Sequence, residues 1–248
     1  MLAAAWAGGP AADKTGVETQ TPHPLSLGTR DYARAALARA FEEAAVMPGT
    51  LLPHELLQDL TEAAGRIVDE VTSNGTELFP KDGSGPWAYI IEHSVDATVI
   101  GLQIGRRLLP GESLEELGIG LFLQDIGKLA LPEAIVQKPG PLAPDEWALM
   151  MRHPLLGLEF LRDDSIPAGA KSVVRSHHER WDGSGYPAGL VGEEATVFAR
   201  IAAVADSFDA MTSERYHAPA APVPVAAEII RSAAGTDFDP DVVAALLD

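Results

Sequence analysis

The chain has 248 residues, no cysteine, and 36 acidic against 18 basic side chains, which gives a formal net charge of −18 at pH 7. The lack of cysteine excludes disulfides, thiolate metal sites and cysteine nucleophiles, so any metal must be held by His, Asp, Glu or other nitrogen and oxygen donors. The acidic balance argues against a DNA or RNA polymer as partner. A small anionic ligand stays compatible with it if a bound cation supplies positive charge.

The first third of the chain predicts a tail followed by two helices. Residues 1–27 are rich in Gly, Pro, Thr and Ala, which predicts a disordered tail or linker. Residues 31–45 are strongly helix-forming, and a second helix is predicted from Pro53 to about residue 72 because apolar residues recur there at helical spacing. We expect residues 28–80 to form a small N-terminal helical appendage that either senses a signal or pairs two protomers into a homodimer.

From residue 81 onwards, helical segments alternate with short turns. Helices are predicted at 87–109, 113–126, 144–162, 168–179, 196–212 and 222–234, with a last short one from residue 239. Runs of alternating β-branched residues do not occur, so the predicted fold class is all-α. No apolar run long enough to span a membrane occurs, and the opening segment lacks the basic flank of a signal peptide. We therefore expect no membrane span and a cytoplasmic location.

Candidate metal ligands recur along this second part of the chain. Successive donors lie 24 to 32 residues apart, about one helix and its connection each time, so separate helices could direct them into one bundle interior. Such an arrangement suits two metal ions. Each histidine taken alone is more often an ordinary packed or surface residue, but four of the seven histidines fall in this one pattern. The donors are His93, Asp125, His153, His177, His178 and Asp206.

Four stretches of the sequence resemble HD-GYP domains. HHERWDGSGYPAGL at 177–190 is similar to the signature of this family, and QDIGKLALPEAIVQKPGPLAPDEWALMMRHPLLG at 124–157 resembles the segment that begins with its His-Asp pair. EHSVDATV at 92–99 and ARIAAVADSFDAMTSERY at 199–216 resemble its first and last ligand helices. The resemblance covers roughly residues 87–246 in unbroken order, and it implies an HD-domain helical bundle, here placed at 81–248.

The resemblance implies a metal-dependent phosphodiesterase of bacterial signalling. Such enzymes hydrolyse cyclic di-GMP (c-di-GMP) to pGpG, and sometimes to GMP, through a metal-bridging hydroxide. The implied cofactors are two divalent ions, iron or manganese, because Tyr89 stands where members with a third metal have Glu. By motif position, one metal would be bound by His93, Asp125 and Asp206. The other would be bound by His153, His177 and His178, with Asp125 bridging both.

The resemblance also implies contacts with the substrate. Lys128 lies one turn from Asp125 and would reach a phosphate or the developing charge, with a salt bridge to a neighbouring carboxylate as the structural alternative. Tyr186 would stack on a guanine or bond to it, unless it only packs a plain turn. Asp209 and Arg215 would line the substrate pocket, and for Arg215 the alternative is a solvated helix end.

Gln124 departs from the family pattern, because it stands where the family has the histidine of its His-Asp pair. A carboxamide oxygen is a poorer ligand than imidazole for these metals, so the first metal position should be weakened. Two alternatives stay open: a catalytically impaired c-di-GMP receptor or interaction module, and an HD-type phosphohydrolase for another phosphoester, which the GYP loop disfavours.

Overall fold

The structure is a computed structural model that describes residues 23–46, 52–74, 76–77, 87–162, 165–213 and 220–248. The predicted tail falls almost entirely outside this part of the chain, and Arg215 lies outside it as well. The elements are β1 His23–Pro24, α2 Leu27–Val46, α3 His54–Asn74, β2 Thr76–Glu77, α4 Ala88–Leu108, α5 Glu115–Leu123, the 3-10 helix η1 Ile126–Ala130, α6 Glu133–Val136, α7 Pro144–Met150, α8 His153–Phe160, α9 Ala168–Ser176, the 3-10 helix η2 Gly192–Glu194, α10 Val197–Thr212, α11 Val223–Ser232 and α12 Pro240–Leu247.

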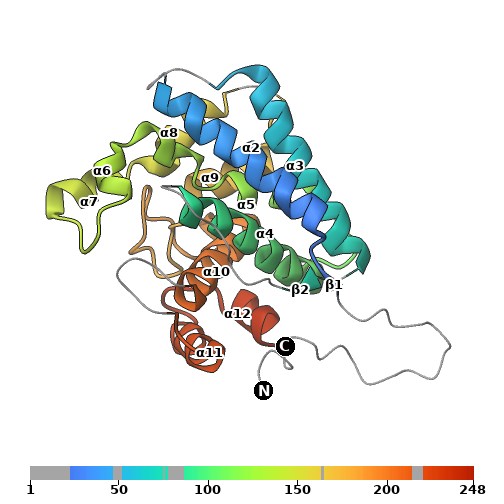
Figure 1. Ribbon diagram of the computed structural model, residues 1–248. Helices are drawn as coiled ribbons and strands as arrows, with labels where there is room; N and C mark the ends of the chain where they lie inside the picture. Colours follow the sequence, from blue (N-terminus) through green and yellow to red (C-terminus); the bar gives the residue numbers. More distant parts are fainter. Residues whose placement is uncertain (1–22, 47–51, 75, 78–86, 163–164, 214–219) are drawn as a thin grey trace.

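Helix α4 runs through the middle of the bundle. Every residue from Ile90 to Leu102 is buried, and α4 is packed by α2, α3, α5, α10 and α12 (Figure 1). Gly105 permits the close approach of α5, since a Cβ at this position would lie 2.7 Å from Leu117 Cδ2. A helix surrounded in this way is held on all sides, so polar side chains on it point into the protein and not into water.

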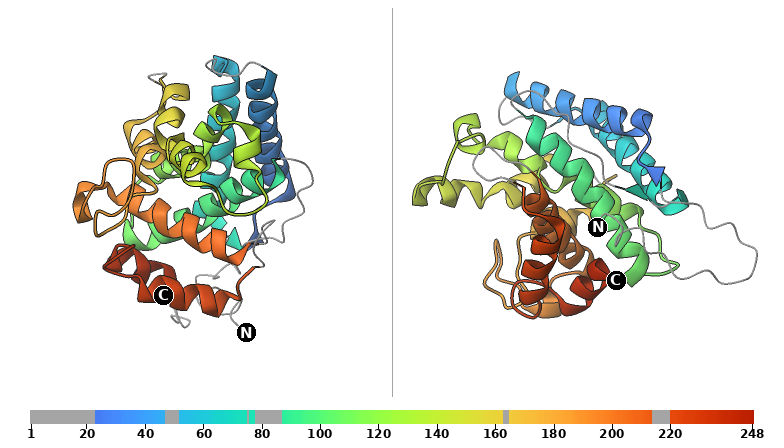
Figure 2. Two further views of the ribbon diagram at one scale, coloured as in Figure 1. Left: turned by 90° about the vertical axis from the view of Figure 1, so that its left-hand side faces the viewer. Right: turned by 60° about the horizontal axis from the view of Figure 1, so that its bottom comes forward.

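Helices α2 and α3 lie side by side against one face of the bundle, opposite α11 and α12 (Figures 1 and 2). Their buried side chains, among them Leu37, Leu60 and Ile67, belong to the same hydrophobic core as those of α4 and α5. Strand β1 pairs in parallel with β2 at His23 and Thr76. One hydrophobic core runs through residues of both 28–80 and 81–248. The division into an appendage at 28–80 and a bundle at 81–248 stays a prediction.

The predicted all-α class is confirmed, and several predicted helices differ in their bounds. The helix predicted at 31–45 begins at Leu27, and the one predicted at 168–179 ends at Ser176. The helix predicted at 113–126 ends at Leu123, after which the chain turns into η1. The helix predicted at 144–162 is two helices, α7 and α8, because Pro154 stands in the first turn of α8 and cannot continue an earlier helix. None of the helices in the described ranges combines the length and apolarity needed to cross a bilayer.

A buried ion-pair network joins α2 to α4. Arg30 Nη2 lies 2.5 Å from Glu92 Oε2, and Arg30 Nη1 lies 3.3 Å from Asp96 Oδ1. Arg34 of the same helix also pairs with Glu92. Glu92 and Asp96 flank His93 on α4, and both are almost fully buried. The network therefore ties the N-terminal helices to the segment of α4 that carries a candidate metal ligand.

Removal of the Arg30 guanidinium is expected to destabilise the protein strongly. Arg30→Ala leaves Glu92 and Asp96 buried with less positive charge, which costs about 3–5 kcal/mol of the free energy of unfolding. Urea unfolding followed by circular dichroism measures the loss. Arg39→Ala is the matched control, because Arg39 lies on the same helix in an exposed pair with Asp59, 2.8 Å away, and should cost about 1 kcal/mol or less. Equal losses in the two variants would contradict this account.

Candidate metal centre

The predicted donors come from five separate places in the fold, and most of them stand at helix ends. His93 lies on α4 and Asp206 on α10, whereas Asp125 lies in the turn between α5 and η1. His153 is the first residue of α8, and His177 and His178 directly follow α9. The sequence predicted donors on helices, but a helix end gives a side chain more freedom of direction than the middle of a packed helix does.

Four of these donors form one compact group. The ligand atoms of Asp125, His153, His177 and His178 all lie within 4.8 Å of one another. Burial lowers the pKa of His153 to about 3, and it also lowers the pKa values of His177 and His178. These three imidazoles are therefore neutral at pH 7, which is the protonation state that a metal requires of a histidine ligand.

The tautomers of two histidines leave their Nε2 atoms facing each other without a proton. His153 Nδ1 lies 2.8 Å from the carbonyl oxygen of Met150, and His177 Nδ1 lies 3.1 Å from that of Val174. A carbonyl only accepts, so Nδ1 is the donor in both rings and Nε2 carries a lone pair. The two Nε2 atoms lie 3.2 Å apart. Two acceptors so close repel each other unless a cation lies between or beside them, so this group fits a bound metal.

Asp125 is the member of this group that lies near His93. Its Oδ1 accepts no hydrogen bond from any described residue and is 3.4 Å from His153 Nε2, while its Oδ2 is 3.8 Å from His93 Nε2. Burial acts to raise the pKa of Asp125, but Lys128 and the surrounding histidines hold it well below its usual value. The carboxylate is thus ionised and has one oxygen near His153 and the other near Lys128 and His93, and its predicted bridging of two metals stays a prediction.

His93 is held between two carboxylates on α10. Its Nε2 lies 2.8 Å from Asp206 Oδ1 and its Nδ1 lies 2.6 Å from Asp209 Oδ2. Burial alone would lower the pKa of His93, but these two bonds raise it to about 9 in the metal-free protein. His93 would therefore have to lose its Nε2 proton, which now faces Asp206, before it could bind a metal. Asp209 is buried and also accepts a hydrogen bond from Ser213 Oγ, so its carboxylate orients His93. The predicted contact of Asp209 with substrate stays a prediction.

Gln124 is fully buried beside Asp206. Its Nε2 lies 3.4 Å from Asp206 Oδ1, the same oxygen that His93 contacts, and its Oε1 accepts no hydrogen bond within the described residues. A buried amide oxygen without a donor is costly, and a cation would satisfy it. Gln124 therefore lies among the donors of the first predicted metal, where its oxygen is the available ligand atom.

Lys128 forms an ion pair with Asp125, which is the salt bridge to a neighbouring carboxylate that the sequence indicated as the alternative to a substrate contact. Its Nζ lies 2.6 Å from Asp125 Oδ2, and its side chain is partly exposed. An ammonium group has three donors, so this pair leaves others for a phosphate oxygen. The predicted contact with substrate stays a prediction.

Tyr186 lies at the edge of the histidine group. Its ring centroid is 4.8 Å from that of His178, and its amide nitrogen donates to the carbonyl oxygen of His178 over 3.1 Å. Glu179, which the sequence did not single out, holds the loop by accepting hydrogen bonds from the amides of Ala188 and Leu190. A Cβ at Gly185 would lie 2.6 Å from Glu179 Cα, so this close approach requires glycine.

Gly127 permits another close approach, between η1 and α8. A Cβ at Gly127 would overlap the carbonyl oxygen of His153 and the amide nitrogen of Gly157, both of which are backbone atoms that cannot turn aside. The glycine therefore allows the segment that carries Asp125 to lie directly against the start of α8, where His153 begins the helix.

Gly127→Ala is expected to separate these two donors. The added methyl group should cost about 1–3 kcal/mol or more of the free energy of unfolding and should also reduce the number of metal ions bound per chain. Gly65→Ala is the control, because a Cβ at Gly65 of α3 meets nothing within 4 Å and should leave the stability equal or raise it by about 1 kcal/mol. Elemental analysis and urea unfolding check both variants. A Gly127→Ala protein with unchanged metal content would show that the close contact between η1 and α8 is not needed for metal binding.

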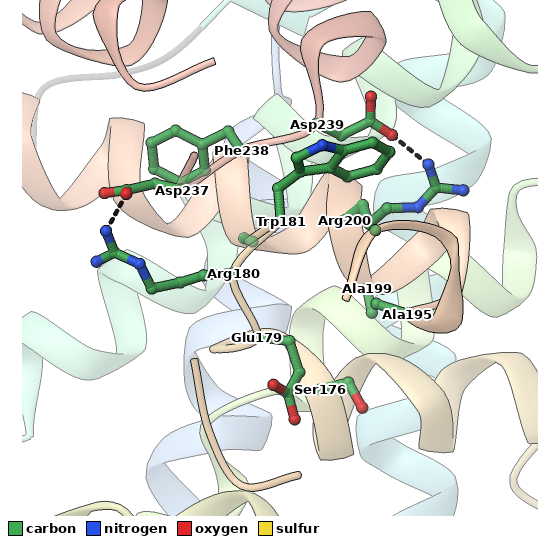
Figure 3. Close-up of a pocket in the computed structure, with 12 residues that line it drawn as sticks. Ser176, Glu179, Arg180, Trp181, Ala195, Ala199, Arg200, Asp237, Phe238 and Asp239 are labelled. Atoms are coloured by element: carbon green, nitrogen blue, oxygen red, sulfur yellow. Dashed lines mark hydrogen bonds and ion pairs between the residues drawn. The ribbon is translucent and has the colours of Figure 1, made fainter. Parts of the chain in front are cut away.

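A small hollow beside residues 176–181 contains none of the predicted site residues. Figure 3 shows that the ion pairs Arg180–Asp237 and Arg200–Asp239 lie around it with Trp181. The guanidinium carbon of Arg200 also lies 5.6 Å from the Trp181 ring centroid. These contacts attach the segment after α9, and helix α10 through Arg200, to the chain near α12. We assign the hollow no part in the candidate centre.

The helical bundle and its inward-facing donors define an all-α protein with a candidate metal centre. The family model of the HD domain matches residues 91–242, and the chain belongs to the HD domain family. The predicted relationship to HD-GYP domains is confirmed.

Curated relatives match over much of the chain. It is 38% identical over 199 residues to the cyclic di-GMP phosphodiesterase response regulator RpfG of Xanthomonas campestris pv. campestris. The matched residues make up 79% of this chain and 51% of the relative. It is also 34% identical over 243 residues to the cyclic di-GMP phosphodiesterase PA4108 of Pseudomonas aeruginosa. This match includes 96% of this chain and 56% of the relative. The chain thus spans about half the length of these relatives.

A solved structure shares the fold. The structure described as Bd1817, an HDG"Y"P protein from Bdellovibrio bacteriovorus, aligns with a TM-score of 0.64 over 99% of this chain and 75% of that chain. The sequence identity is 19%, so this likeness concerns the fold alone.

Proposed function

We propose that this protein is a metal-dependent c-di-GMP phosphodiesterase that opens the cyclic dinucleotide to pGpG and cleaves part of it further to GMP. The observation that carries the proposal is the pair of facing Nε2 acceptors of His153 and His177, with the unbonded Oδ1 of Asp125 beside them. The names of the relatives support the choice of substrate.

The donor set supports two metal ions, which we propose to be iron or manganese. His153, His177 and His178 would hold one ion, His93, Gln124 and Asp206 the other, with Asp125 between them. Such a pair lowers the pKa of a bound water and neutralises charge on phosphoryl oxygens. Imidazole and carboxylate donors without thiolate suit these metals.

The chain's own side chains would orient and hold the substrate. The ammonium group of Lys128 would contact a phosphate oxygen while it stays paired with Asp125, and Arg215 would contact another. Burial raises the pKa of Tyr186, so its hydroxyl stays protonated at neutral pH and can donate a hydrogen bond to a guanine. Asp209 would keep His93 in place by accepting a hydrogen bond from His93 Nδ1.

The test is a product assay on the full chain. Protein loaded with Fe²⁺ or Mn²⁺ is incubated with c-di-GMP, and the nucleotides are separated by chromatography. We expect pGpG and GMP to form and a chelator to stop their formation. Absence of both products from metal-loaded protein that also fails to bind c-di-GMP would refute the proposal. Cleavage of another phosphodiester but not of c-di-GMP would instead favour a phosphohydrolase of different specificity.

Gln124 favours a second candidate, a c-di-GMP receptor or interaction module that binds without cutting. Its carboxamide is a weak metal ligand where imidazole is expected, so the position at Asp206 would bind its ion less tightly. Calorimetry that detects c-di-GMP binding together with an absence of product would support this candidate. The cytoplasmic location and the homodimer stay predictions from the sequence.

A further inference from the structure

Helix α7 carries a large aromatic side chain that does not enter the core. Neither α6 nor α7 has a buried residue, and Figure 1 shows both at one edge of the molecule, away from the α2–α3 pair. Trp147 on α7 is 46% exposed. Exposing so much of an indole forgoes part of the free energy that its burial would contribute, so core packing does not explain this residue.

Trp147 is the outer end of a row of rings that leads to the metal donors. Its ring centroid lies 6.2 Å from that of Tyr186, with the two planes at 80°. Tyr186 lies 4.8 Å from His178, whose ligand atom belongs to the compact donor group. The edge-to-face contact fixes the indole against Tyr186, and the exposed part of the indole remains accessible beside the candidate centre.

Both sides of this aromatic corner, formed by Trp147 and Tyr186, are held by polar contacts. On the Trp147 side, Glu146 Oε2 accepts hydrogen bonds from the amide of Ala143 over 2.6 Å and from Lys138 Nζ over 2.5 Å. The Lys138 bond is the main cause that lowers the pKa of Glu146, so this anchor is ionised at neutral pH. On the Tyr186 side, Glu179 holds the loop through two amides. A corner fixed before binding loses less entropy when a flat ring docks on it.

We propose that Trp147 is a specificity-determining residue that stacks on a purine base of the cyclic dinucleotide, with Tyr186 as the second wall. This inference rests on the proposed function, because it places the substrate's phosphodiester at the donor group. A cyclic dinucleotide carries two flat bases beside its phosphates, and an exposed indole next to a phosphate-binding centre matches that chemistry. Stacking of a base on an aromatic side chain contributes about 1–3 kcal/mol.

The test measures equilibrium binding by calorimetry to the metal-loaded full chain. The ligand is the bis-phosphorothioate analogue of c-di-GMP, which resists cleavage, and inorganic phosphate is the probe without a base. Trp147→Ala should raise the Kd of the analogue by about 5-fold to 100-fold, whereas the Kd of phosphate should stay within twofold. Trp147→Phe, which keeps an aromatic face, should recover most of the affinity.

Leu155→Ala is the matched control, because Leu155 on α8 is also 46% exposed and has no part in the aromatic corner. Its Kd for both probes should equal that of the wild type. If the wild type binds the analogue and Trp147→Ala binds it equally well, the stacking role is refuted and the proposed function stands. An equal loss of phosphate binding in Trp147→Ala would also refute it, since the residue would then support the centre as a whole. Wild-type protein that binds no analogue would refute the proposed function and this inference together.

Discussion

An Asp125→Asn variant is expected to lose its tightly bound metal and to hydrolyse c-di-GMP about 10³-fold more slowly than the wild type, or not at all. The change keeps the shape of the side chain and removes its charge. In the wild type, Asp125 directs Oδ1 toward His153 and Oδ2 toward Lys128 and His93. An amide offers one weak oxygen ligand in place of two, so it cannot serve both groups of donors at once.

Asp182→Asn is the control for this variant. Asp182 belongs to the loop after the His177–His178 pair, and its Oδ1 accepts hydrogen bonds from the amide and hydroxyl of Ser184. Its carboxylate is not among the donors, so metal content and turnover should stay within about threefold of the wild type. Elemental analysis gives the metal content, and chromatography of the nucleotides gives the rate. Full activity of Asp125→Asn would remove the bridging role from the account.

A Gln124→His variant is expected to bind the first metal about 10–100-fold more tightly and to gain activity by a similar factor. Imidazole replaces an amide that contacts Asp206 from a fully buried position next to His93. The nitrogen lone pair of the new ring is a stronger ligand than the amide oxygen, which accepts no hydrogen bond in the described structure. The side chains are similar in size, so the bundle should accept the change.

Titration with Mn²⁺ under competition from a chelator measures the affinity of the variant. Gln137→His is the control, because Gln137 follows α6 and its amide bonds to Glu133. That variant should titrate like the wild type. A Gln124→His protein with wild-type metal affinity would mean that residue 124 does not ligate. If it gains metal affinity but still forms no product from c-di-GMP, the receptor function becomes the better assignment.

The sequence indicated which candidate side chains come together better than it predicted the backbone around them. His153 and His177 were identifiable because their motifs have fixed spacing, and the structure brings them to 3.2 Å. The break after Leu123 was not predicted, because no proline within residues 113–126 signals it; in the structure η1 follows there and packs against α8. The packing also explains Gly127, whose need for a bare Cα cannot be seen without the neighbouring backbone.

Contacts between distant segments could not be predicted either, because they also depend on tertiary packing. Arg30 and Glu92 are 62 positions apart, and nothing in either segment indicates the other. Trp147 and Tyr186 belong to different motifs, so their ring contact depends on how α7 projects from the bundle. The contact of Asp209 with His93, 116 positions away, was likewise not predicted, and its contact with substrate, which the resemblance implies, stays a prediction.

The number of metal ions that the wild-type chain binds can be measured directly. Protein equilibrated with Mn²⁺ is dialysed at a series of free ion concentrations, and bound manganese per chain is measured together with the same series for His177→Ala. We expect two ions per chain at saturation, one bound more weakly than the other, and we expect His177→Ala to lose the tighter one. A wild-type chain that binds no ion at any concentration, or a His177→Ala chain that binds both as before, would contradict this expectation.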